Sequence, residues 1–113
     1  MVLQILKYVT AAATILVGVV SLFWPRQVFG FTGLEANGGR GITEIRTILG
    51  ALFIGLGAAV LYLNTPAAYQ VLGITYLVMA IARSISMFVD KSVVSSNVIS
   101  AISELAFGII LIL

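Results

Sequence analysis

Five charged residues stand inside or at the ends of long apolar runs, and their types are the ones that could do chemistry in this chain. Carboxylate and guanidinium groups are costly to leave unpaired in an apolar helix. They therefore pair with one another, bind a polar ligand or carry a proton. Two hydroxyl-bearing neighbours complete the candidate site. The candidate residues are Glu44, Arg46, Arg83, Asp90, Glu104, Tyr76 and Ser100.

Several kinds of chemistry are excluded or disfavoured by composition. The chain has no cysteine, so disulfides, thiolate metal ligands and thiol nucleophiles are absent. It has no histidine, which removes the commonest metal ligand and the commonest base for activating a serine. We predict no metal site and no cofactor. The net charge of +2 is small and scattered, so we expect no nucleic-acid partner.

The low proportion of charge predicts a membrane protein. Of 113 residues, 61% are hydrophobic and only 9% are charged, whereas soluble domains average about 25% charged residues. The apolar runs are about 20 residues long and do not alternate in polarity, which favours helices over a barrel. We predict an all-α, integral membrane four-helix bundle in a single domain, 1–113. The expected spans are about 3–24, 42–63, 67–89 and 95–113.

Turn signals separate these spans. Trp24 and Pro25 end the first, and the Asn64-Thr65-Pro66 sequence divides the second from the third. The connection 25–41 combines an apolar, aromatic part, expected in the membrane interface, with a Gly-rich part, expected as a flexible turn. Thr43 is a candidate N-cap or first-turn residue of the second span.

Small residues recur on one face of the first two spans, which predicts close helix packing. On the second span these residues include Gly50 and Gly57. On the first span the face consists of Lys7, Ala11, Thr14, Gly18 and Ser21.

When four consecutive spans cross the membrane in alternating directions, all five candidate charges fall in the same half of the membrane. Glu104 stands about 14 Å into its helix, near the middle of a hydrocarbon core of about 30 Å. We predict an Arg83–Glu104 contact and a contact of Arg46 with Glu44 or Asp90. The cluster either locks the helices in register or forms the base of a pocket, and spacing alone leaves both open.

The order of these motifs resembles one family. Glu-Ile-Arg precedes a Gly-rich helix, Ala-Arg-Ser-Ile-Ser precedes an acid, and Ser-Glu-Leu-Ala-Phe-Gly lies in the last helix. This pattern is similar to the small bacterial four-helix membrane proteins of domain-of-unknown-function family 4345, loosely grouped with DoxX/DoxD-like proteins. The resemblance implies a four-helix bundle without an established activity, and Lys91 replaces the glycine that usually follows the acid. The matching positions are Glu44, Arg46, Gly50, Arg83, Ser86, Asp90 and Glu104.

Three functions are compatible with these features. The first is an accessory or structural subunit that associates with itself or with a larger membrane complex. The second is a lipid-binding or small-molecule-binding protein, or a membrane enzyme, that uses the charged cluster. The third is a small transporter, disfavoured because the first span lacks the glutamate on which small multidrug exporters rely.

Membrane lipids are the expected surroundings, in the cell inner membrane. Arg26, Arg40 and Lys91 fall on connections of one side, and Lys7 falls on the other. The positive-inside rule then places both termini outside the cytoplasm.

Overall fold

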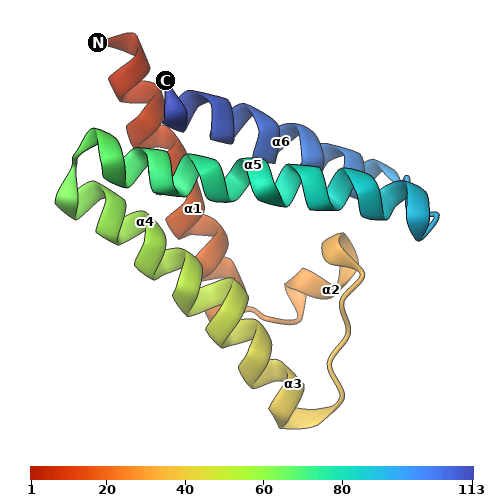
Figure 1. The fold of residues 1–113 in the computed structure, drawn as a ribbon. Helices are drawn as coiled ribbons and strands as arrows, with labels where there is room; N and C mark the ends of the chain where they lie inside the picture. Colours follow the sequence, from red (N-terminus) through yellow and green to blue (C-terminus); the bar gives the residue numbers. More distant parts are fainter. The chain divides into compact units, whose positions relative to one another are not determined.

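A computed structural model describes residues 1–113 and contains helices but no strand (Figure 1). Four longer helices dominate the chain, and two short helices and a π-helical segment lie between the first and the second of them. The elements are α1 (Val2–Phe23), α2 (Gln27–Thr32), α3 (Gly38–Glu44), η1 (Ile45–Ala51), α4 (Leu52–Leu63), α5 (Pro66–Val89) and α6 (Ser95–Ile112).

Four helical stretches are long and apolar enough to cross a membrane. They are Val2–Phe23, Gly38–Leu63, Pro66–Val89 and Ser95–Ile112. Seven of the eight predicted span boundaries agree with these bounds to within one residue. The four candidate spans indicate a multi-pass membrane protein.

The second span begins at Gly38, not at residue 42, so the Gly-rich part of the connection is helical where a flexible turn was expected. Thr43 is not an N-cap. It lies inside α3, and its hydroxyl donates to the Gly39 carbonyl oxygen at 3.0 Å. A salt bridge between Arg40 and Glu44, one turn apart, supports this added turn despite its glycines.

A π-helical segment, η1, interrupts the regular geometry of the second span. At its end the Leu52 N–H donates to the Thr47 carbonyl oxygen, five residues earlier. The α-helical hydrogen bond reaches only four residues back, so the helix is locally wider. Apolar periodicity did not signal this change.

The chain forms two compact units. Unit 1 contains residues 1–10 and 64–113, and unit 2 contains residues 11–63. Each unit is described by itself below, and α1 contributes to both. The single domain and the four-helix bundle remain predictions.

In unit 2, α1 approaches the second span through glycines. A Cβ on Gly18 would lie 2.6 Å from the Gly50 carbonyl oxygen and 2.7 Å from the Ile54 amide nitrogen. A Cβ on Gly57 would lie 2.8 Å from the Ala11 carbonyl oxygen. The helices therefore touch backbone to backbone, which confirms the close packing predicted from the small residues.

In unit 1, α5 and α6 lie side by side and antiparallel (Figure 1). Gly73 and Gly108 face each other across this contact: a Cβ on Gly73 would lie 3.0 Å from the Gly108 carbonyl oxygen. Tyr69 and Leu111 are almost fully buried. This close antiparallel contact positions the charged residues of the two helices.

Short local features set the ends of α5. The Thr65 hydroxyl accepts the Ala68 N–H at 3.2 Å, and Pro66 occupies the first turn, where its missing N–H costs nothing. At the other end Lys91 adopts a left-handed conformation with φ of 52°, and the Ser92 N–H donates to the Met87 carbonyl oxygen at 2.9 Å. The turn therefore has a backbone shape that suits glycine, the residue that the family resemblance implies at position 91.

Candidate functional site

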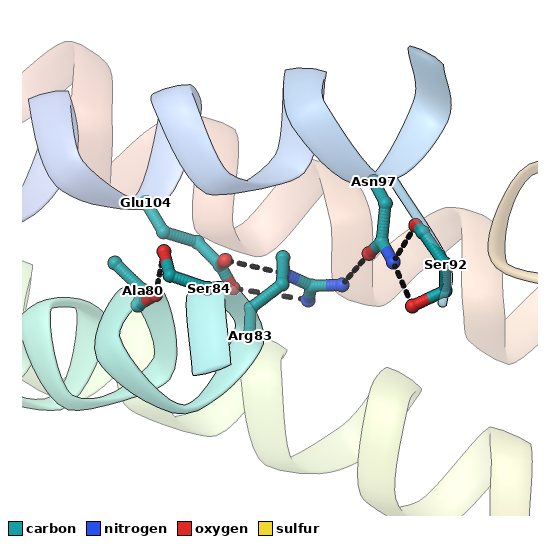
Figure 2. A network of polar contacts seen from close by, with 6 residues as sticks. All are labelled: Ala80, Arg83, Ser84, Ser92, Asn97 and Glu104. Carbon is teal, nitrogen blue, oxygen red and sulfur yellow. Dashed lines mark hydrogen bonds and ion pairs between the residues drawn. The ribbon is translucent and has the colours of Figure 1, made fainter. Parts of the chain in front are cut away.

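The central polar feature is a two-pronged ion pair between α5 and α6 (Figure 2). Arg83 Nε donates to Glu104 Oε1 at 2.6 Å, and a terminal Arg83 nitrogen donates to Glu104 Oε2 at 3.1 Å. This fork-to-fork geometry is the strongest arrangement for a guanidinium and a carboxylate. The predicted Arg83–Glu104 contact is confirmed.

Asn97 extends this pair toward the α5–α6 turn (Figure 2). The second terminal nitrogen of Arg83 donates to Asn97 Oδ1 at 2.9 Å. The Asn97 amide then donates to the Ser92 carbonyl oxygen at 3.0 Å and approaches the Ser92 hydroxyl at 3.3 Å. The guanidinium is thus tied both to the facing helix and, through Asn97, to the loop that joins the two helices.

The Arg83–Glu104–Asn97 network is closed. The Glu104 side chain is 7% exposed and the Arg83 side chain 34%. Both carboxylate oxygens accept a hydrogen bond, and no buried side-chain nitrogen or oxygen of the chain lacks a partner. A network in which every buried polar atom has a partner stabilises one relative placement of two helices.

Asp90 lies outside the network. Its carboxylate accepts the Ser86 hydroxyl at 2.6 Å, within the last turn of α5. Ser86 and Asp90 are both among the residues that carry the family resemblance, and here they form a local contact that closes the helix end.

The predicted contact of Arg46 with Glu44 is wrong, and the alternative contact of Arg46 with Asp90 stays a prediction. Glu44 pairs with Arg40, one turn earlier, and both side chains are largely exposed. Arg46 is an exposed residue of η1. The prediction overlooked Arg40 because its glycine-flanked position indicated a loop, which has no helical spacing to bring i and i+4 together.

The two hydroxyl candidates have different surroundings. Tyr76 is buried on α5 and packs edge to face on Phe107 of α6, with 5.5 Å between ring centroids. Ser100 is half-buried on α6, one turn before Glu104. Neither belongs to the network drawn in Figure 2.

Sequence reasoning left a second group of polar and aromatic residues out of the site. The Tyr69 hydroxyl donates to Asn64 Oδ1 at 2.8 Å, the Lys7 ammonium lies 5.7 Å from the Tyr69 ring centroid, and the Tyr8 ring is 6.4 Å away. The Asn-Thr-Pro turn was the only signal for it. Because Lys7 and Tyr69 are 62 positions apart, spacing within one helix could not have joined them.

An open apolar groove of about 570 Å³ runs along the α5–α6 contact. Its one hydroxyl, on Ser84, donates to the Ala80 carbonyl oxygen at 2.7 Å, so the groove offers no free polar group. No cluster of His, Cys, Asp or Glu side chains could hold a metal ion. The groove is lined by Leu77, Ala80, Ile81, Ser84, Ile85, Ala101, Ile102 and Leu105.

Fold and charge network together define the class of protein. It is an all-α chain with four helices able to cross a membrane and an ion pair between the last two. Residues 2–113 match the family described as a domain of unknown function, DUF4345, and the protein belongs to that family. The resemblance to this family stated from the motifs is thereby confirmed, whereas the bacterial origin and the DoxX/DoxD grouping stay predictions. Neither the curated proteins nor the solved structures contain a significant match.

Proposed function

We propose that the protein is an accessory or structural membrane subunit that associates with itself or with a larger membrane complex. In this proposal the four spans form one bundle, and the Arg83–Glu104 pair locks α5 against α6. The proposed location is the cell inner membrane. Both termini lie outside the cytoplasm, because the basic connecting segments belong on the inner side.

The pairing of both Glu104 oxygens carries this proposal. A carboxylate that binds a ligand or transfers a proton must present an oxygen to it. Here both oxygens are held by one guanidinium, and the remaining terminal nitrogen of that guanidinium is held by Asn97. Opening the site would leave buried charge unpaired, at a cost of several kcal/mol. The geometry therefore favours a structural role for the cluster over catalysis or transport.

The assembly of the full chain tests the proposal. The tagged protein is extracted from its native membrane in a mild detergent, and the mass of the purified particle is measured by native mass spectrometry. We expect a discrete assembly of fixed stoichiometry. The double variant Arg83→Met with Glu104→Leu should give the same assembly, because it replaces charge pairing by apolar packing. A monomer in the wild type would contradict the subunit role. Loss of assembly in a folded double variant would show that the charges do more than lock the helices.

The groove favours a second candidate, a protein that binds a lipid acyl chain. Its lining is apolar and its one hydroxyl is already bonded, so a hydrocarbon chain suits it better than a polar ligand. Lipids retained through purification would be quantified by mass spectrometry. Ala101→Phe, which fills the groove, should reduce retention. Ala82→Phe, at an exposed α5 position outside the groove, is the matched control. Equal retention in both variants would contradict lipid binding in the groove.

A further inference from the structure

The connector between the first two spans, residues 24–37, carries an unusual surface for a segment outside the candidate spans. Trp24 is 57% exposed, and Phe31 and Leu34 are each 49% exposed. Apolar side chains on a span are covered by lipid chains, but these three belong to no span. They need a different covering, and water is an unfavourable one.

Hydrogen bonds order the backbone of the connector. The Trp24 N–H continues the α1 pattern by donating to the Val20 carbonyl oxygen at 2.8 Å, and Val28 is buried. The Thr32 hydroxyl donates to the Val28 carbonyl oxygen at 2.6 Å and accepts the Leu34 N–H at 3.1 Å. Hydrogen bonds therefore order the backbone on both sides of α2, and the apolar side chains that this backbone carries are exposed.

The far end of the connector packs against the start of the second span. A Cβ on Gly41 of α3 would lie 2.8 Å from the Ala36 Cβ, so the chain returns closely onto the start of the second span. Phe23 ends one candidate span and Gly38 begins the next. Covalent continuity thus places both ends of the connector at the level where two helices enter the bilayer.

A single basic residue stands among these apolar side chains. Arg26 is exposed, follows Trp24 by two residues and takes part in neither ion pair of the chain. The one acidic residue of the connector, Glu35, is nine positions further along. Aromatic rings beside a guanidinium match the headgroup region, where rings rest on the acyl boundary and the cation meets anionic phosphate.

We propose that the connector 24–37 is an interfacial binding surface for anionic phospholipid, with Trp24, Phe31 and Leu34 at the acyl boundary and Arg26 on the headgroup. The proposal rests on the membrane assignment above. It goes beyond that assignment by naming a lipid class and the residues that select it.

Trp24 is the only tryptophan of the chain, so its fluorescence reports on this surface alone. The full-length protein is reconstituted in phosphatidylcholine vesicles, with or without anionic phosphatidylglycerol, and a brominated form of one lipid is used as quencher. Bromines near the carbonyl end of the acyl chains should quench Trp24 more strongly than bromines near the chain end. Brominated phosphatidylglycerol should quench more strongly than brominated phosphatidylcholine at equal content.

Arg26→Gln should lower the preference for phosphatidylglycerol about fivefold, which corresponds to about 1 kcal/mol for one basic residue near an anionic surface. Lys91→Gln is the matched control, because it removes the same charge from the α5–α6 turn. The preference of the Lys91→Gln variant for phosphatidylglycerol should equal that of the wild type. An equal fall in both variants would overturn the proposal, since the preference would then reflect general surface charge.

Absence of quenching by either bromine position would also overturn the proposal, provided that the protein resists alkaline extraction from the vesicles. Release of the protein by alkaline extraction would instead refute the membrane assignment itself. The two failures are therefore distinguished by one additional measurement.

Discussion

Replacing Glu104 by leucine should destabilise the α5–α6 pair by leaving Arg83 without its carboxylate. Glu104 is almost completely buried and accepts two hydrogen bonds from one guanidinium. Leucine cannot accept either bond. The Asn97 oxygen then becomes the only hydrogen-bond partner left to the guanidinium in this network.

The magnitude follows from the burial of the two partners. Removing one member of a buried ion pair costs about 3–5 kcal/mol. The Arg83 side chain is one-third exposed and six residues from the end of α5, about 9 Å along the helix, so it can bend toward the interface. We therefore expect a loss of about 2–3 kcal/mol in the free energy of unfolding.

The assay is reversible unfolding in mixed micelles, in which a denaturing detergent is titrated against a mild one and helicity is followed by circular dichroism. Glu104→Leu and Arg83→Met are measured singly and together. The double variant should recover most of the wild-type stability, because apolar side chains that replace a buried pair are often neutral or stabilising.

Two results would refute the reasoning. A loss below about 0.5 kcal/mol in Glu104→Leu would place the pair among exposed salt bridges of little consequence. The loss in the free energy of unfolding of the double variant would then be compared with the two single losses. If it equals their sum, the two side chains act independently, because a coupled pair must be non-additive.

Three further outcomes are expected in the same assay. Gly18→Ala should lower the free energy of unfolding by about 1–3 kcal/mol, because the added Cβ would meet the backbone of the facing helix. Gly55→Ala is the control and should be neutral or stabilising, because nothing lies within 4 Å of its added Cβ. Similar losses in both variants would contradict the backbone contact. Lys91→Gly should raise stability by about 1 kcal/mol because φ of 52° is strained for a lysine, and a lower stability would contradict this. Tyr69→Phe should cost about 1 kcal/mol through its lost hydrogen bond, and the exposed Tyr62→Phe should change nothing; equal effects would show that the hydroxyl contact is unimportant.

The sequence by itself determined the number, the helical nature and most of the bounds of the four spans. These are local properties: an apolar run of bilayer length must form a helix, and Trp-Pro or Asn-Thr-Pro must end it. It also led to the prediction, though not the proof, that Arg83 and Glu104 meet. Two opposite charges in consecutive apolar helices pair because the alternative is an unpaired charge in hydrocarbon.

The tertiary structure decided which partners the other charges take and how the backbone accommodates them. Arg40 reaches Glu44 only because a glycine-rich stretch is helical, and propensity indicated the opposite. Asn97 joins Arg83 because the antiparallel turn brings the start of α6 beside the end of α5. The π-helical segment and the left-handed Lys91 likewise depart from the backbone geometry that local propensity predicts. Such contacts join residues that are distant in sequence, or override local preference, so no pattern within one segment could specify them.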